Sequence, residues 1–144
     1  MRQLRLTGLG AVLVLAMAGS AQAQAQSNYI RGALDRMDAL ADGLQYGSNL
    51  SFDLSRVPAG RQFTRTVAPA TGNPIRVTAA CDTDCDRLQL RVVDYQNRPV
   101  AYEQPHTGSS TLRFHPQAGQ TYRVYAQPLD CRAAYCYVFV GVWQ

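Results

Sequence analysis

The sequence contains no lysine, only two histidines and a single glutamate, Glu103, and its charged residues amount to 17%. Because Glu103 is the single Glu, the paired carboxylates of a glycosidase would have to include aspartate. Residues 24–144 contain no nucleophile elbow, phosphate loop, paired metal-binding histidines or dinucleotide-binding glycine turn. We therefore predict that the protein is not an enzyme and uses no cofactor.

The two histidines, His106 and His115, each stand beside a proline in a turn-like segment. Ser109 and Ser110 follow His106 closely, but adjacency in sequence does not create the geometry of a nucleophile and its base. We expect both histidines to be exposed loop residues without a catalytic role.

The basic residues are all arginine, and two of the fourteen lie within the first five residues. Arg2 and Arg5 precede an apolar run over about 6–18, and the segment ends in Ala21-Gln22-Ala23, which fits a secretory signal of residues 1–23. The run is shorter than the roughly 20 residues of a membrane-spanning helix. Cleavage leaves twelve Arg against ten acids, a net charge of +2. The composition of the mature chain therefore no longer favours a nucleic-acid partner. We predict a periplasmic or secreted protein without a transmembrane segment after cleavage.

The four cysteines form two closely spaced pairs, Cys81 with Cys85 and Cys131 with Cys136. An even number of cysteines in a small exported chain predicts disulfides. A four-cysteine zinc site is the rival interpretation, but its ligands usually lie in knuckles rather than beside apolar strands. Three connectivities are possible, and we favour the two local bridges because a turn-like segment separates the members of each pair.

A helix is expected over residues 27–46, with Ser27 or Asn28 as its cap. Its apolar positions follow the helical period at Ile30, Leu34, Met37, Ala41 and Leu44. This stripe is short for a free-standing coiled coil. We expect the helix to pack on its own domain, with docking on a partner or a second copy as the alternative.

From residue 50 onward the apolar period changes to two, which predicts strands. The expected strands cover residues 50–54, 63–67, 75–81, 88–92, 100–102, 112–114, 122–126 and 137–143. Turn segments such as Pro58-Ala59-Gly60 and Pro116-Gln117-Ala118-Gly119 separate them. We predict one mainly β domain over 50–144, a jelly-roll-like antiparallel sandwich of seven or eight strands, in which the last strand, apolar on both faces, is central.

Three segments form a recognisable set: an acidic loop leading into a strand (81–90), a turn of the form D-x-x-N within 92–101, and a strand with the spacing G-x-x-Y-x-V over 119–124. Together they resemble the bacterial pre-peptidase C-terminal domain. The resemblance extends over about 50–143 and implies a jelly-roll-like sandwich on an exported bacterial protein. Gln89 stands where an acidic residue is usual, and a role as an appendage to a protease is not carried over.

The acidic loop is a weak calcium candidate. Asp82, Asp84 and Asp86 alternate along it, with Asp94 downstream, and clustered carboxylates can supply three or four of the six to eight oxygens that calcium requires. The loop lacks a full D-x-D-x-D-G pattern with a terminal Glu, so we expect a solvated acidic turn and no metal.

Four arginines, Arg76, Arg91, Arg113 and Arg123, lie out of phase with the core positions of their strands. If those strands share a sheet, the arginines line one face, to which Tyr125 adds a ring. Guanidinium groups bind carboxylates and phosphates in a bidentate manner. The face is thus a possible site for an anion or a partner, and a solubilising charged face is the simpler interpretation.

Two functions remain. We favour an exported, non-catalytic binding or structural module of the bacterial cell envelope that contacts a protein or a glycan. The alternative is a small periplasmic inhibitor or accessory subunit of an exported enzyme, acting through the disulfide-tied tip at Cys131 and Cys136. The sequence does not predict the oligomeric state.

Overall fold

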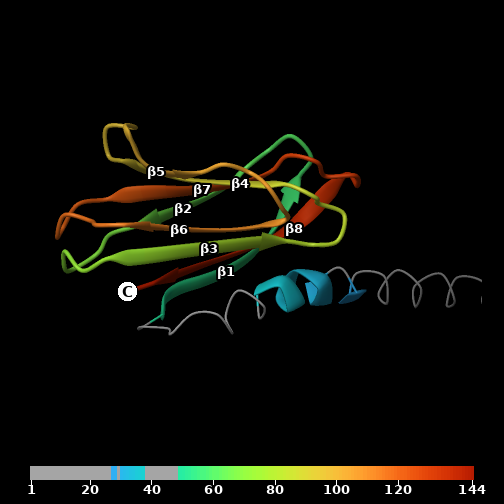
Figure 1. Ribbon diagram of the computed structural model, residues 1–144, viewed down its shortest axis with the longest axis horizontal. Coiled ribbons are helices and arrows are strands. Elements are labelled where there is room, and N and C mark those ends of the chain that lie inside the picture. Colours follow the sequence, from blue (N-terminus) through green and yellow to red (C-terminus); the bar gives the residue numbers. More distant parts are fainter. Residues whose placement is uncertain (1–26, 29, 38–48) are drawn as a thin grey trace, which may run out of the picture.

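The computed structural model describes residues 27–28, 30–37 and 49–144, which form a short helix and eight strands (Figure 1). The helix comprises 27–28 and 30–37. The strands are β1 (Asn49–Pro58), β2 (Phe63–Val67), β3 (Ile75–Cys81), β4 (Leu88–Asp94), β5 (Pro99–Glu103), β6 (Ser109–Phe114), β7 (Tyr122–Pro128) and β8 (Tyr135–Trp143). The signal segment 1–23 and the helix positions Ala41 and Leu44 lie outside the described residues.

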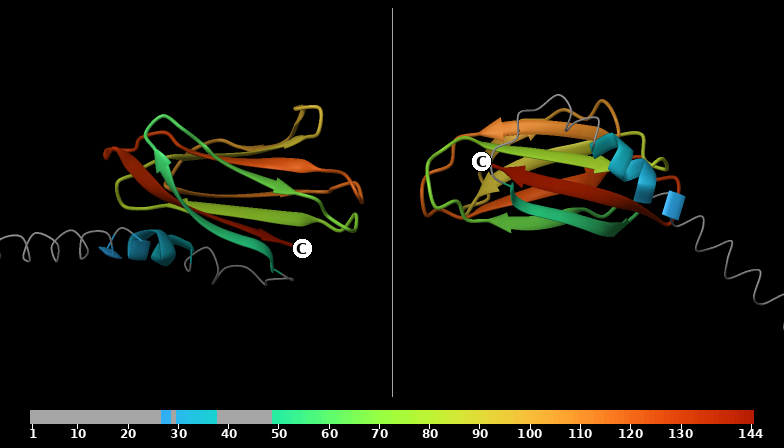
Figure 2. Two further views of the ribbon diagram at one scale, coloured as in Figure 1. Left: turned by 180° about the vertical axis from the view of Figure 1, so that it is seen from behind. Right: turned by 90° about the horizontal axis from the view of Figure 1, so that it is seen from below.

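The strands form two antiparallel four-stranded sheets that pack face to face (Figures 1 and 2). The first sheet has the order β1-β8-β3-β6 and the second has the order β2-β7-β4-β5. Most connections pass from one sheet to the other, and together these orders make an eight-stranded jelly roll. The predicted fold class is confirmed.

The core lies between the sheets and is built from the alternate, inward-facing positions of the strands. Val77, Leu90, Val124 and Val140 are all fully buried there. The last strand, β8, lies between β1 and β3, and eight of its nine residues are buried. Its apolar side chains face the core on one side and the outer surface of the first sheet on the other, as the prediction of a central strand requires.

The helix packs against the outer face of the first sheet of its own domain (Figure 2). Ala33 and Met37, one turn apart, are buried with Ala80, Phe139 and Trp143. Leu34, which the helical period places on the buried side, is instead 37% exposed. The stripe prediction is wrong there because Ala33 and Met37, rather than the leucine, face the sheet. Gly32 lies against the Cys81–Cys85 loop, where a Cβ would stand 2.9 Å from Thr83 Cγ2.

The first strand faces the opposite way from the orientation that its pattern indicates. Phe52 and Leu54 point outward and are exposed, whereas Asp53 lies on the inward side. Two contacts explain this reversal: the Phe52 ring packs on Phe139 at 4.7 Å between centroids, and the Asp53 carboxylate binds Arg65 of β2. Because β1 and β2 are edge strands of the two sheets, their inward polar groups meet at an open side of the sandwich.

Candidate functional site

The four arginines do not share one face, so the single arginine face that the sequence suggests is wrong. Arg76 on β3 and Arg113 on β6 lie directly opposite each other on the outer side of the first sheet. Arg91 on β4 and Arg123 on β7 lie on the outer side of the second sheet. The alternation within a strand gives the side on which a residue lies, but the topology assigns β3 and β6 to one sheet and β4 and β7 to the other.

A row of four side chains crosses the second sheet and includes Arg91. Thr64, Tyr125, Arg91 and Tyr102 occupy directly opposite positions on β2, β7, β4 and β5. We call these four residues the Arg91 row. Adjacent strands lie about 4.8 Å apart, so Arg91 lies between the positions of two tyrosines. Its guanidinium stacks over the Tyr125 ring at 4.5 Å from the centroid, and Tyr102 is 55% exposed.

Glutamine side chains surround the Arg91 row. Arg91 Nη2 donates to Gln62 Oε1 at 3.1 Å, and Gln89 Nε2 donates to the Tyr102 hydroxyl at 3.4 Å. Gln127 lies opposite Gln89 in the next row of the sheet. Beside them, Gln62 and Gln127 help to line a depression of about 460 Å³. Tyr102 and these glutamines were not among the binding residues predicted from the sequence, although Tyr102 is in phase with the outward positions.

Charge on this face is positive and uncompensated. Arg123 donates to the amide oxygen of Asn97, and Arg91 to that of Gln62, so neutral groups anchor both. The outward positions on the four strands of the second sheet hold no Asp or Glu. Elsewhere the structure pairs arginines with acids: Arg65 with Asp53, Arg87 with Asp130, Arg98 with Asp94, and Arg132 with Asp86.

The acidic loop does not bring its three aspartates together. Asp82 is buried and accepts a hydrogen bond from the Tyr137 amide at 2.9 Å, whereas Asp86 is exposed and pairs with Arg132. Burial raises the pKa of Asp82, while the Tyr137 amide acts in the opposite direction. In the described part of the chain no three His, Cys, Asp or Glu side chains are grouped as metal ligands. The weak calcium candidate Asp82, Asp84 and Asp86 therefore gains no support.

Asp94 stabilises the turn between β4 and β5 through hydrogen bonds. Its carboxylate accepts from the amides of Gln96 and Arg98, at 2.8 and 2.9 Å, and from the Arg98 guanidinium at 2.7 Å. Partial desolvation raises the pKa of Asp94, but these hydrogen bonds outweigh it and hold the pKa below its usual value. Asn97 adopts a left-handed backbone conformation with φ of 63°. The D-x-x-N segment is a structural turn.

The cysteines form the two local bridges, Cys81–Cys85 and Cys131–Cys136. An isolated β-bridge joins Cys85 to Cys131, so both disulfide loops lie together at one end of the sandwich. Arg132 fastens them, because its guanidinium donates to Thr83 O at 2.7 Å and pairs with Asp86.

Arg36 of the helix binds the first disulfide loop, a contact that no sequence pattern predicts. Its Nη1 donates to the carbonyl oxygens of Cys81, Asp82 and Cys85, at 3.0, 3.0 and 2.8 Å. A Cβ at Gly108 would stand 1.8 Å from this nitrogen and 2.7 Å from Cys85 O, so the close approach requires glycine there. The contact anchors the helix to the sandwich.

The histidines are exposed and lie beyond opposite ends of β6, His106 before it and His115 after it. Ser110 faces the core and is buried, while Ser109 is within hydrogen-bonding distance of the Thr107 hydroxyl. The structure therefore does not bring a histidine and a serine together as base and nucleophile at these positions.

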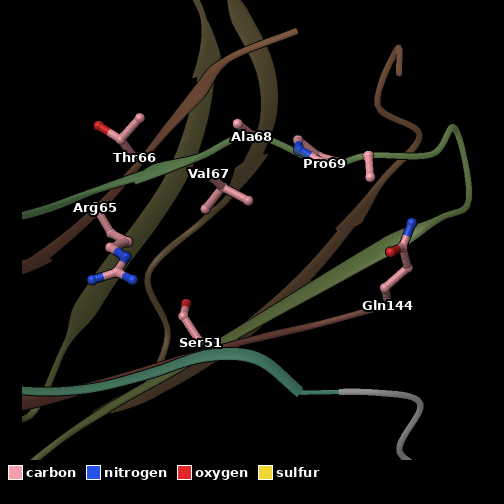
Figure 3. A pocket seen from close by; sticks show the side chains of 8 residues that line it. Ser51, Arg65, Thr66, Val67, Ala68, Pro69 and Gln144 are labelled. Carbon is pink, nitrogen blue, oxygen red and sulfur yellow. The ribbon is translucent and has the colours of Figure 1, made fainter. Parts of the chain in front are cut away.

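A second depression lies at the open side between β1 and β2 (Figure 3). It has a volume of about 320 Å³ and is lined by Ser51, Arg65, Val67, Gln144 and neighbouring residues. Arg65, the one cation among its lining residues, already pairs with Asp53 at 3.1 Å. The second sheet thus remains the better candidate for binding. Among the described residues no helix has the length and apolar character needed to cross a membrane.

No protein-family model and no curated protein matches this chain. Solved structures with a similar chain course include the pre-peptidase C-terminal domain of a collagenase from Bacillus anthracis, at 17% identity and a TM-score of 0.48, covering 67% of this chain and 90% of that one. A carbohydrate-binding module from Cellvibrio mixtus lichenase 5A has 8% identity and a TM-score of 0.41 over 69% and 91% of the chains. A periplasmic inhibitor of g-type lysozyme from Aeromonas hydrophila has 10% identity and a TM-score of 0.42 over 68% and 85%. The first of these structures is a pre-peptidase C-terminal domain, the family that the sequence resembles.

Proposed function

We propose that the protein is an exported, non-catalytic binding module of the cell envelope and that it contacts a glycan through the outer face of the second sheet. The observation that carries the proposal is the Arg91 row: a cation held between two tyrosines, one of them more than half exposed. Tyrosine offers an apolar ring and a hydroxyl together, which suits sugar surfaces with apolar and polar sides.

The Arg91 row is held in place before any ligand arrives. Stacking on Tyr125 and the hydrogen bond to Gln62 restrict the Arg91 side chain, and Gln89 does the same for Tyr102. Side chains fixed in this way lose little conformational entropy on binding, which favours affinity. A face that served only for solubility would not need such anchoring.

Export is part of the proposal. The two disulfides are typical of proteins in oxidising compartments. We propose that residues 1–23 form a cleaved signal, that a helix over 27–46 follows, and that the sandwich of 50–144 acts in the periplasm or outside the cell.

The alternative function, an inhibitor or accessory subunit acting through the Cys131–Cys136 tip, has less support. Arg132, the one charged side chain in that loop, is already bound to Thr83 and Asp86. An inhibitory loop needs side chains free to enter the target enzyme, and this tip is fastened to the neighbouring disulfide loop instead.

Binding to a panel of immobilised cell-envelope glycans tests the proposal. Tyr102→Ala should weaken retention about tenfold or more, because exposed aromatic anchors carry a large share of binding energy. Tyr95→Ala is the matched control, since Tyr95 is 57% exposed but lies in the β4–β5 turn. If the two variants and the wild type are retained equally, the outer face of the second sheet is not the binding site.

A further inference from the structure

Six arginines of the described residues bind side-chain oxygens of two kinds, carboxylates or amides. Those near the sandwich edges and loops, such as Arg65 and Arg87, are neutralised by carboxylates. Arg91 and Arg123, on the outer face of the second sheet, are anchored by amide oxygens instead. An amide fixes the position of a guanidinium without cancelling its charge, so this face keeps two positioned and uncompensated cations.

Arg91 also has hydrogen-bonding capacity left. A guanidinium carries five N–H donors in a planar fork, and the side chain gives one of its nitrogens to Gln62. Within the described part of the chain no acid contacts Arg91, so its remaining donors can serve a ligand. A carboxylate matches such a fork in a bidentate manner.

The groups around Arg91 have a different complementarity. Gln89 and Gln127 present amides, each with donors and an acceptor, on the same outer face, and such groups suit hydroxyls rather than charges. Tyr102 and Tyr125 flank the cation on either side and offer apolar ring surface. A ligand that uses all three features carries carboxylates, many hydroxyls and some apolar surface.

We infer that the ligand of the second sheet is a polysaccharide that bears carboxylates, with a sugar carboxylate bound at Arg91 between Tyr102 and Tyr125. This inference rests on the proposed function, since it names the class of glycan that the same face takes. An acidic protein would satisfy the charge, but the paired glutamines and the flanking rings favour a hydroxyl-rich ligand over a chain of carboxylates alone.

The experiment compares polygalacturonate with its fully methyl-esterified form, because the two share one backbone and differ in the free carboxylate. Binding is measured by affinity electrophoresis and calorimetry at about 0.1 M salt, where surface charges are screened over about 10 Å. The esterified polymer should bind at least tenfold more weakly to the wild type. Polyglutamate serves as the acidic polymer without sugars, and it too should bind more weakly than polygalacturonate.

Variants assign the effect to one residue. Arg91→Gln should reduce affinity for polygalacturonate about tenfold, the change expected from losing a bidentate ionic contact, and should change affinity for the ester little. Arg91→Lys keeps the charge but loses the planar set of donors, so its affinity for polygalacturonate should lie between those of the wild type and Arg91→Gln. Arg113→Gln is the matched control, because it removes the same charge from the outer face of the first sheet. Trp143 emission verifies that each variant is folded.

Four results would overturn the inference. Equal affinity of the wild type for acid and ester, with both weakened by Tyr102→Ala, would leave the proposed glycan function intact and remove the carboxylate from it. Equal losses in Arg91→Gln and Arg113→Gln would indicate general charge attraction. Equal binding of polyglutamate and polygalacturonate would point to an acidic protein. If none of the three polymers binds but a neutral glycan of the panel does, the proposed glycan binding stands and a carboxylate-bearing ligand is excluded.

Discussion

Removal of the Arg36 side chain should release the helix from the sandwich. Arg36 Nη1 lies within 3.0 Å of three carbonyl oxygens in the Cys81–Cys85 loop. The rest of the helix contact consists of Ala33 and Met37 on the first sheet. Arg36→Ala removes the polar part of this contact and leaves the apolar part intact, so the variant measures the polar part alone.

The hydrogen-bond geometry of Arg36 sets the free energy by which this contact stabilises the docked helix. Nη1 carries two hydrogens for three acceptors, so the contact is equivalent to about two charged hydrogen bonds of 1.5–3 kcal/mol each. Arg36 is only half-buried, which lowers the total to about 3 kcal/mol. Burial of Met37 contributes roughly 2 kcal/mol. A described helix segment of this length is not stable alone in water, so loss of more than half of its anchoring energy should undock it.

The single tryptophan of the chain reports on this event. Trp143 is 8% exposed and packs with Met37 and Ala33, so undocking should shift its emission to longer wavelength and increase its quenching by acrylamide. The matched control is Arg31→Ala, an exposed arginine of the same helix. Gly108→Ala should reproduce the effect, because the added Cβ would displace the Arg36 guanidinium. Unchanged emission and unchanged unfolding free energy in Arg36→Ala would refute this account of helix docking.

Three further outcomes follow from the structure. Each local disulfide closes a loop of only about five residues, so replacing either Cys81–Cys85 or Cys131–Cys136 by serines should cost about 2 kcal/mol, and thermal unfolding should remain cooperative at a lower temperature. Burial raises the pKa of Asp82, so the ionised carboxylate destabilises the folded state once the pH rises through the folded-state pKa. Asp82→Asn should therefore raise the melting temperature at pH 7. Below about pH 4, where Asp82 is protonated, the melting temperatures of variant and wild type should converge in a pH series of thermal melts. The mature protein should begin near Gln24, and an intact mass from the native host that includes residues 1–23 would contradict this.

The fold was largely predictable because the period-two pattern of a sandwich core is local. Inward positions such as Val77 and Leu90 alternate with polar residues, and turn residues mark the ends of the strands. The exceptions are elements whose environment is not local. Phe52 and Leu54 resemble core residues, but their strand is at a sheet edge, where Phe139 offers apolar contact on the outer face and Arg65 attracts Asp53 inward.

The helix contact with the disulfide loop could not be predicted for a related reason. Arg36 binds main-chain carbonyls 45 to 49 residues away, and carbonyl groups are present at every position, so they leave no mark in the sequence. The one residue whose identity depends on the contact is Gly108, and a glycine in a turn-like segment has an ordinary local interpretation.

The candidate site shows the same division between local and distant information. Alternation places Arg76, Arg91 and Arg123 on outward positions, and the structure agrees for each. The sheet that each strand joins depends on the whole topology, which separates Arg76 from the other two by the thickness of the sandwich. A ligand on one outer face therefore meets either Arg91 with Arg123 or Arg76 with Arg113, and only the first pair has Tyr102 and Tyr125 beside it. Substitutions on the two opposite faces, which share no partners, should have additive effects.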